Sequence, residues 1–234
     1  MRLLEAFDSR ATSLSVTELS RRSGVPLSTT SRMVAELTRQ GLLSRADDGR
    51  HIQVGVRLWE LASRAAPTRG LREAALPFME DLHTVIRHHV QLGVLDGHDV
   101  LFVERLSARE AVINLTEVAG RLPLHASSSG LVLLAHAEPQ TQAAVLDGGL
   151  RRFTPATITS PERLRVVLSE IRRTGYAHTP GHIRDAAAGV AVPIRDRHES
   201  VIASLGVVVP NDETAARTVP ALRAAAQGIQ RAMT

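Results

Sequence analysis

The sequence predicts an α+β protein in two parts, a small helical unit with a β-hairpin followed by a larger domain of strands and helices. Three observations carry this prediction. Segments with helical apolar spacing precede an Asp-Gly turn within the first 55 residues. A further helical stretch ends at a Pro-Thr-Arg-Gly break, and apolar strand segments alternate with helices from there to the end of the chain.

Length and composition suit one large or two small globular domains, since 44% of the 234 residues are hydrophobic and 22% are charged. Acidic residues among the first eight positions, and the lack of a long apolar run, argue against a signal peptide and a membrane span. We therefore expect a cytoplasmic protein with no membrane partner. The absence of Cys excludes disulfides, thiolate metal sites and a Cys nucleophile. A net charge of +4 is by itself weak evidence for nucleic-acid binding.

Three short helices are expected first. Residues 2–9 carry apolar side chains at helical spacing, and Ser15-Val16-Thr17-Glu18 fits a capping box that starts a second helix. The Gly24-Val25-Pro26 segment ends that helix. A third helix is expected over residues 27–40, with Gly41 as its stop.

The third helix has one apolar and one polar face. Its apolar positions, at i, i+3, i+4 and i+7 spacing, are Thr30, Met33, Val34 and Leu37. The outer face then carries Ser28, Thr29, Arg32, Glu36 and Arg39. Two short strands over residues 42–45 and 51–54 follow, joined by a turn at Asp48-Gly49.

These elements indicate a winged helix-turn-helix over residues 1–55, with a purely structural helical bundle as the alternative. Hydroxyl and guanidinium groups on the outer face of the third helix can donate to phosphates and to guanine edges. The hairpin adds two Arg beside two Asp, so its wing is nearly neutral. The predicted DNA-binding residues are Ser28, Thr29, Arg32, Arg39, Arg45 and Arg50.

A linker helix is expected within residues 56–68. Its helical part, residues 56–66, has an apolar stripe that includes Trp59, the only Trp of the chain. Because an exposed aromatic ring of this size is costly, we expect Trp59 to lie in the core or in a dimer seam. The Pro67-Thr68-Arg69-Gly70 break then leads into a second domain over residues 69–234.

The second domain is predicted as antiparallel strands with helices segregated at their ends, unlike a doubly wound parallel sheet. The expected strands cover residues 89–95, 100–105, 111–115, 190–194 and 201–209. The expected helices cover residues 71–86, 131–137, 142–146, 161–174 and 214–233. Pro77 should lie on the outer side of the first of these helices or near its true start, Ser160 should cap the fourth, and Pro220 should interrupt the last.

With a winged helix, a linker helix and an α+β domain in this order, the chain resembles the IclR family of bacterial transcription regulators over nearly its whole length. The matching motifs are Val25-Pro26-Leu27-Ser28-Thr29-Thr30-Ser31-Arg32, Gln40-Gly41-Leu42-Leu43, Leu122-Pro123-Leu124-His125-Ala126 with Gly130, Gly175-Tyr176-Ala177 and Val192-Pro193-Ile194-Arg195-Asp196. The resemblance implies a GAF-like second domain that binds a small effector, and a homodimer or dimer of dimers. It implies a regulator that binds double-stranded operator DNA and responds to a ligand, with repression as the preferred mode of action. No cofactor is expected.

The resemblance also implies where a small organic acid binds. Carried over to this sequence, the effector residues are Leu122, Ser127, Ser128, Ser129, Thr179, Gly189, Gly206 and Val208. Three hydroxyl groups and free amides at the start of a helix suit a carboxylate. The alternative is that one Ser only caps a helix that begins at Leu131.

Several positions depart from the family pattern. Gly181-His182 replaces an acidic pair, Ala186-Ala187-Ala188-Gly189 replaces Gly-x-x-Cys, and Leu131 replaces a Lys. Gly206 and Val208 stand where the last strand often has serines. These changes predict a roomier pocket with fewer donors, which favours a monocarboxylate with a hydrophobic or aromatic body over a two- or three-carbon keto acid.

No enzyme signature accompanies these motifs, because Gly-x-Ser-x-Gly, His-Glu-x-x-His, phosphate-loop and dinucleotide glycine patterns are all absent from the sequence. No catalytic residue and no metal ligand is therefore predicted. His178 and His182 lie four apart, but Pro180 and Gly181 between them indicate a loop. His125 is expected to pack or to form a hydrogen bond.

Two other hypotheses stay open beside the ligand-responsive regulator. One is a constitutive DNA-binding protein whose second domain only dimerises. The other is an enzyme with an appended DNA-binding arm, which would need a convergent acid and base that the sequence does not reveal.

Overall fold

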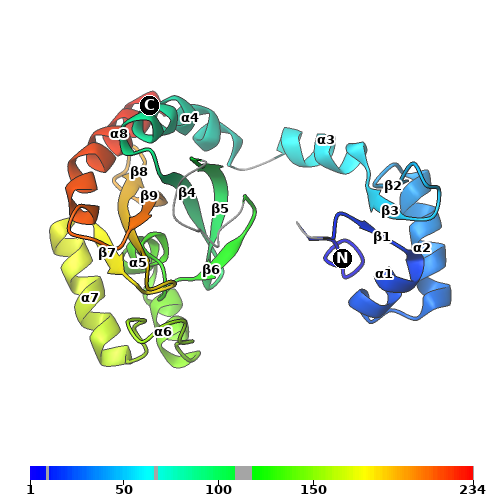
Figure 1. Cartoon of the computed structure of the whole chain (residues 1–234), viewed down its shortest axis with the longest axis horizontal. Helices are drawn as coiled ribbons and strands as arrows, with labels where there is room; N and C mark the ends of the chain where they lie inside the picture. The colour runs from blue at the N-terminus through cyan, green and yellow to red at the C-terminus, as the bar shows by residue number, and fades with distance from the viewer. Residues whose placement is uncertain (9–10, 66–67, 109–117, 234) are drawn as a thin grey trace. The chain divides into compact units, whose positions relative to one another are not determined.

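A computed structural model describes residues 1–8, 11–65, 68–108 and 118–233, which divide into two compact units, Met1–Arg69 and Gly70–Thr234 (Figure 1). The core clusters of the two units are separate, with one cluster in the first unit and one on each face of the sheet in the second. None of the helices in the described ranges combines the length and the hydropathy of a transmembrane segment. The two units are described in turn.

The N-terminal unit is a helix-turn-helix with a small antiparallel sheet, as predicted. Its elements are β1 (Ser13–Leu14), α1 (Val16–Ser23), α2 (Leu27–Arg39), β2 (Leu43–Arg45) and β3 (Ile52–Val54). The strand order is β1-β3-β2, so β1 adds a strand that the sequence did not predict. Leu19, Val34, Leu43 and Ile52 are buried between the helices and the sheet. This core holds α2 with its other face toward solvent.

Local hydrogen bonds set the ends of α1. The Glu18 amide donates to Ser15 Oγ at 3.2 Å, and the Ser15 amide donates to Glu18 Oε2 at 2.9 Å, which confirms the predicted capping box. Gly24 ends the helix with φ at 66°, a left-handed conformation that suits Gly.

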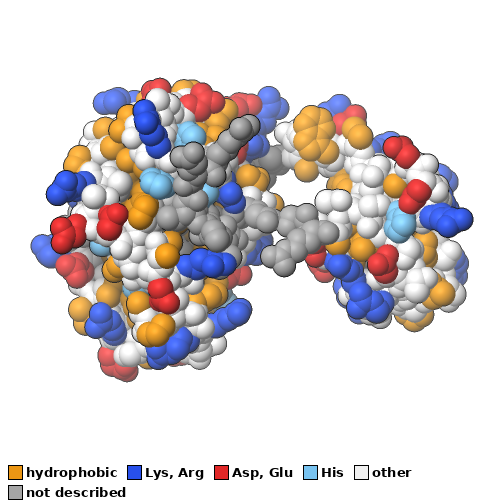
Figure 2. Space-filling model, viewed as in Figure 1, with side chains coloured by type: hydrophobic (Ala, Val, Ile, Leu, Met, Phe, Trp, Pro, Cys, Tyr) orange, Lys and Arg blue, Asp and Glu red, His pale blue; other side chains and the backbone are white. Residues whose placement is uncertain are grey.

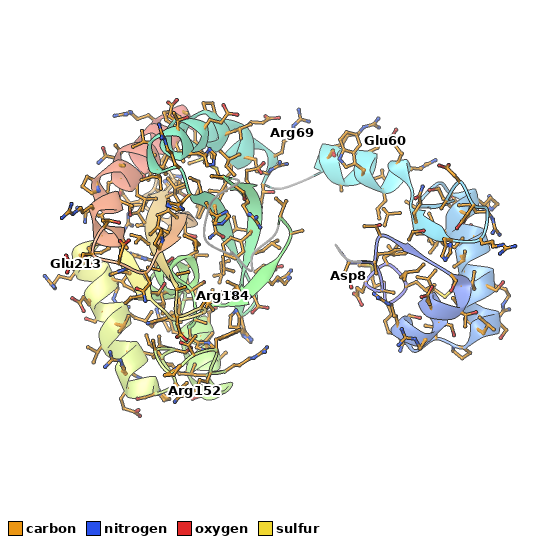
Figure 3. All side chains as sticks on the ribbon, in the orientation of Figure 1. Asp8, Glu60, Arg69, Arg152, Arg184 and Glu213 are labelled. Carbon is orange, nitrogen blue, oxygen red and sulfur yellow. The ribbon has the colours of Figure 1, made fainter. Side chains whose placement is uncertain are left out.

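The predicted helix over residues 2–9 is wrong. In the described part of that range, residues 2–6 form turns, in which the Leu4 and Glu5 amides both donate to the Met1 carbonyl. So short a segment does not recover the cost of helix nucleation. Asp8, labelled in Figure 3, pairs instead with Arg22 of α1; the distance from Arg22 Nη1 to Asp8 Oδ2 is 3.1 Å, and this contact ties the turn to the helical pair.

The linker helix α3 (Val56–Ala65) leaves its apolar stripe in solvent. Val56, Trp59 and Leu61 are 72%, 69% and 49% exposed, and Figure 2 shows hydrophobic side chains gathered over α3. Figure 3 labels Glu60 on the same helix. The expectation that Trp59 lies in the core is therefore wrong for the single chain, while the dimer seam stays a prediction.

The second unit is built on a six-stranded sheet in the order β6-β5-β4-β9-β8-β7, with every pairing antiparallel, which confirms the predicted sheet type. The strands are β4 (His89–Asp96), β5 (Asp99–Leu106), β6 (Arg121–Pro123), β7 (Ala177–Pro180), β8 (Ala187–Arg195) and β9 (Val201–Pro210). The edge strands β6 and β7 were not predicted. The strand expected over residues 111–115 lies outside the described residues.

The helices of this unit cover both faces of the sheet, so the prediction of helices segregated at the strand ends is wrong (Figure 1). The helices are α4 (Arg69–Ile86), α5 (Ser128–Ala135), α6 (Pro139–Asp147), α7 (Pro161–Thr174) and α8 (Val219–Ala232). α4 and α8 share one core with Val190 and Leu205, whereas α5, α6 and α7 share another with Ala191 and Phe102. Strands β8 and β9 are buried along most of both faces, so each face needs a helical layer.

Several predicted boundaries shift. Pro77 lies inside α4 at an exposed position, on its outer side as one prediction had it. The helix expected over residues 214–233 is a 3₁₀ turn (Ala215–Thr218) followed by α8, because Pro220 suits the first turn of a helix. The helix expected over residues 142–146 extends to Pro139–Asp147, again with Pro in its first turn. Val85, expected on the apolar face of α4, is 72% exposed.

Helix α7 agrees with its prediction at both ends. Ser160 Oγ accepts from the Arg163 amide at 3.2 Å, and Gly175 ends the helix in a left-handed conformation.

Replacing Gly130 with Ala should destabilise the second unit by about 1–3 kcal/mol, because overpacking strains the backbone. A Cβ at Gly130 would lie 2.5 Å from the Leu124 carbonyl oxygen, so α5 can approach that segment only through glycine. Gly70→Ala, also in a helix, meets nothing within 4 Å and should leave stability unchanged or raise it by about 0.4–1 kcal/mol. Urea unfolding followed by circular dichroism measures both; equal stabilities would contradict this packing.

Candidate nucleic-acid interface and effector site

The outer face of α2 presents the predicted polar residues to solvent. Ser28, Arg32 and Arg39 are exposed and Thr29 is half-buried. Pro26 precedes the helix without a side-chain cap, so the amides of the first turn have no capping acceptor among the described residues and can bind an external one. Such amides suit a phosphate oxygen.

Arg32 and Arg39 differ in how their charges are used. Arg39 binds Glu36 with Nε to Oε2 at 2.9 Å and Nη2 to Oε1 at 2.5 Å, and Gln40 donates to the same carboxylate. The Arg39 bonds, followed by that of Gln40, lower the pKa of Glu36 to about 2. No described residue accepts a hydrogen bond from the guanidinium of Arg32. The free positive charge of this face is therefore on Arg32.

Apolar side chains also reach the outer face of α2, which the sequence did not predict. Met33, expected in the core, is 38% exposed, and Leu27 is 51% exposed. Met33 lines a shallow pocket of about 330 Å³ with Thr29, Arg32, Glu36 and Leu37. Apolar groups beside donors suit a base edge that carries a thymine methyl group.

The wing is held by Asp48. Its Oδ1 accepts from the Arg50 amide at 2.9 Å and from the His51 amide at 3.0 Å, and its Oδ2 contacts the His51 imidazole. The His51 amide and imidazole, followed by the Arg50 amide, lower the pKa of Asp48 to about 2. Arg45 Nη1 donates to the Gly49 carbonyl at 3.0 Å within the hairpin. The exposed side chain of Arg50 makes no such bond to any described residue.

In the second unit, the serine segment lies against glycines of the sheet. A Cβ at Gly189 would lie 2.6 Å from Ser128 Oγ and 2.8 Å from Thr179 Oγ1, and one at Gly206 would lie 2.8 Å from Ser129 Oγ. The structure thus brings five predicted effector residues together. The expectation that Gly189 and Gly206 leave a roomier wall is wrong, because serine and threonine hydroxyl groups fill that space.

The sheet register adds residues to this cluster. Thr179 pairs with Gly189, Gly189 with Val208, and Val208 with His89, which forms one row across four strands. Cross-strand partners share a face of the sheet, so this row faces α5. Gln91 pairs with Gly206 in the next row.

His89 and Gln91 are 5% and 4% exposed, and neither was predicted from the sequence as a site residue. The signal was a polar residue at alternate positions of an otherwise apolar strand. His89 Nδ1 lies 3.1 Å from Ser107 Oγ. Buried side chains of this kind give the face beneath α5 an unusual polar character.

The three serines have different roles. Ser127 caps α5 by accepting from the Gly130 amide at 3.1 Å, so the helix starts at Ser128 rather than at Leu131 as predicted. Ser128 and Ser129 are 6% and 2% exposed, and their amides find no acceptor among the described residues. These two residues, rather than Ser127, offer donors to a carboxylate.

Leu122 is separated from the cluster in the sheet. It lies in β6, at the edge opposite β7, and packs against the core that contains Val100 and Phe102. The row beneath α5 runs over β7, β8, β9 and β4, so β5 separates Leu122 from it in the sheet.

The histidines behave as buried or surface side chains. His125 Nε2 lies 2.9 Å from the Arg151 carbonyl, the hydrogen-bonding role predicted for it. Burial, followed by the charges of Arg163, His178 and His125, lowers the pKa of His182 to about 4, so its imidazole is neutral at neutral pH. Among the described residues, no group of three or more His, Cys, Asp or Glu side chains is arranged to hold a metal ion.

Both units match models of known protein domains. The model of the IclR helix-turn-helix domain matches residues 1–47, and that of the bacterial transcriptional regulator IclR C-terminal domain matches residues 64–231. The chain belongs to the IclR family. It is a DNA-binding transcription regulator and not an enzyme, which removes the hypothesis of a catalytic second domain.

Individual relatives cover most of this IclR-family chain. The crystal structure of an IclR homolog complexed with 4-hydroxybenzoate, from Microbacterium hydrocarbonoxydans, is 47% identical with a TM-score of 0.96, and the match covers 99% of this chain and 96% of that one. The HTH-type transcriptional regulator XynR of Escherichia coli is 28% identical over 208 residues, 88% of this chain and 82% of XynR. The transcriptional repressor IclR of Escherichia coli is 26% identical over 213 residues, 90% of this chain and 78% of that protein.

Proposed function

We propose that this regulator binds double-stranded operator DNA through α2 and the wing, represses a bacterial metabolic operon, and responds to an aromatic monocarboxylate bound beneath α5. DNA binding places its action in the bacterial cytoplasm. The observation that carries the ligand class is the likeness to the Microbacterium homolog complexed with 4-hydroxybenzoate.

On the DNA side, Arg32 is the principal contact. Its guanidinium is exposed and free of partners among the described residues, beside Met33 and the open amides of the first turn of α2. Ser28 and Thr29 add neutral hydrogen bonds, which are individually weaker than charged ones. Arg39 contributes less because Glu36 neutralises it, and Arg50 supplies a phosphate contact from the wing.

On the effector side, the amides of Ser128 and Ser129 hold the carboxylate, and Thr179, whose hydroxyl donates to the Gly189 carbonyl at 3.3 Å, lines the site beside them. Their support is the close approach of Ser128 and Thr179 to Gly189 and of Ser129 to Gly206, together with the amides of Ser128 and Ser129, which find no acceptor among the described residues. Val208, His89 and Gln91 form the adjacent surface of the sheet. The proposal that the ligand is aromatic is supported by the ligand of the Microbacterium homolog alone. The space expected at Gly189 and Gly206 gives no support, because hydroxyl groups occupy it.

The assembly is a homodimer or a dimer of dimers. The exposed stripe on α3, with Trp59 at its centre, is a candidate seam because so much apolar surface is unfavourable in water. A two-fold dimer would bind a palindromic operator with half-sites about one DNA turn apart.

The constitutive DNA-binding protein is the remaining alternative, and thermal melting separates it from a sensor. Ligand at 100 times its Kd stabilises the folded state by about 2.7 kcal/mol, which raises Tm by several degrees. We expect 4-hydroxybenzoate to produce this rise in the full chain. A Tm unmoved by aromatic and short-chain acids alike would support the domain that only dimerises.

Residues 69–234 expressed alone should fold, bind the effector and lack DNA affinity. The contact boundary at Arg69 and Gly70 and the separate cores of the two units support this. Size-exclusion chromatography, calorimetry and an electrophoretic shift assay check the three properties. An insoluble fragment from a soluble parent would show that α3 belongs to a shared core.

A further inference from the structure

A pocket in the larger unit lies at the other end of α5 from the serine cluster. It has a volume of about 690 Å³, within the range of small-molecule sites. Its walls come from the end of α5, the start of α6, α7, and the β8–β9 turn. The polar side chains on those walls are His136, Glu138, Gln142, Arg172, Arg195, Glu199 and Ser200.

Two guanidinium groups in this pocket are held by neutral acceptors. Arg172 Nη1 donates to the Ala135 carbonyl at 3.0 Å. Arg195 Nη1 donates to the Glu199 carbonyl at 2.8 Å, and its Nη2 donates to His136 Nε2 at 3.3 Å. Each guanidinium has five N–H donors, so most of them remain unused by described residues.

Carboxylates do little to neutralise these two charges. Arg172 has no acidic partner among the described residues. Glu199 Oε2 is 4.0 Å from Arg195 Nε, and its side chain is 83% exposed, so this pair is weak. Glu138 is also exposed, at the N-cap position that precedes α6. An incoming anion therefore meets two positioned positive groups.

His136 fixes the orientation of Arg195. Its Nδ1 lies 2.9 Å from the Val132 carbonyl, which can only accept, so Nδ1 carries the proton and Nε2 is left to accept from Arg195. Burial, opposed by the Val132 bond and reinforced by the charges of Arg195 and Arg172, lowers the pKa of His136. The imidazole is thus neutral at neutral pH. The positive charge of this part of the pocket wall comes from the guanidinium groups of Arg172 and Arg195.

The β8–β9 turn is held by hydrogen bonds of its own. The Asp196 amide donates to the Ser200 carbonyl at 2.9 Å, and Asp196 Oδ1 accepts from the His198 and Ser200 amides at 2.8 and 3.0 Å. The Asp196 carboxylate is therefore engaged within the turn. Groups fixed in advance lose less entropy on binding.

We propose that this pocket is a second ligand site, which binds a small oxyanion, a carboxylate or a phosphate, between Arg172 and Arg195. Guanidinium groups bind both kinds of anion through paired N–H donors. This inference is independent of the proposed effector site, since it uses residues from the opposite end of α5.

The test uses the full chain, saturated with 4-hydroxybenzoate, and titrates inorganic phosphate or succinate by calorimetry at constant ionic strength. Arg172→Gln and Arg195→Gln remove one guanidinium each. The matched control is Arg173→Gln, which removes the same charge from the same turn of α7, where Arg173 is exposed and lies 3.7 Å from Glu170.

We expect saturable binding of at least one anion by the parent and by Arg173→Gln, and about tenfold or greater weakening in Arg172→Gln and Arg195→Gln. The anion that binds more tightly, phosphate or succinate, shows whether the site prefers phosphates or carboxylates. No binding of either anion, equal binding by Arg172→Gln and the parent, or binding abolished by 4-hydroxybenzoate would overturn the proposal. Should Arg195→Gln fail to fold, Arg172→Gln decides, because the Arg172 side chain is exposed and makes a single hydrogen bond to the described residues.

Discussion

Replacing Arg32 with alanine should cost about 1–3 kcal/mol in operator binding if the side chain contacts a base, or lower the salt slope by about one unit if it contacts phosphate. The reason is that Arg32 is the free guanidinium on the outer face of α2 within the described residues. Fluorescence anisotropy with labelled operator DNA over a salt series separates the two cases.

The matched control for that substitution is the double variant Glu36→Gln and Arg39→Gln. It removes an ion pair from the same face of α2 without changing the net charge. We expect near-normal DNA affinity, because the pair already neutralises itself. Unchanged binding by Arg32→Ala at every salt concentration would show that another face of α2 meets the DNA.

The effector site should prefer 4-hydroxybenzoate to pyruvate or glyoxylate by about 10–100-fold. Both classes offer one carboxylate to the donors at Ser128 and Ser129, but only the aromatic acid buries a ring. Burial of a Phe-sized group contributes about 1.5–3 kcal/mol, which corresponds to that ratio. Calorimetry with the full chain measures it directly.

Two variants locate that site. Thr179→Val keeps the shape but removes a hydroxyl beside Gly189, and Gly206→Val drives a side chain toward Ser129 Oγ. Both should weaken 4-hydroxybenzoate binding by about tenfold or more. Thr174→Val, whose hydroxyl bonds to the Glu170 carbonyl in α7, should bind normally. Tighter binding of the smallest acids, or normal binding by both site variants, would contradict the polarity and the location.

Elements with strong local signals were predictable from the sequence. The capping box at Ser15, the Ser160 cap and the left-handed glycines fix helix ends through neighbouring residues alone. The edge strands β6 and β7 span three and four residues, and only pairing across the sheet defines strands so short. The helix predicted over residues 2–9 failed for the opposite reason. Its apolar side chains have helical spacing, but they pack into the core from turns.

The candidate sites were predictable as sets of residues but not as contacts. The sequence placed small residues at Gly189 and Gly206, and tertiary packing decided that hydroxyl groups fill the space. The i, i+3 spacing of Glu36 and Arg39 was a visible signal for an ion pair. This pair lowers the contribution that Arg39 can make to DNA binding. His89 and Gln91 could be assigned to the site only from the sheet register, which pairs these buried residues with Val208 and Gly206.

The affinity of the full chain for the intergenic DNA beside its own gene, measured with and without saturating 4-hydroxybenzoate, tests the central claim most directly. An effector that binds one arrangement of the regulator better than another should change that affinity by about 5–150-fold, a coupling of about 1–3 kcal/mol. Pyruvate at the same concentration should change it far less. Equal DNA affinity in the presence of 4-hydroxybenzoate that calorimetry shows to be bound would contradict a ligand-responsive regulator.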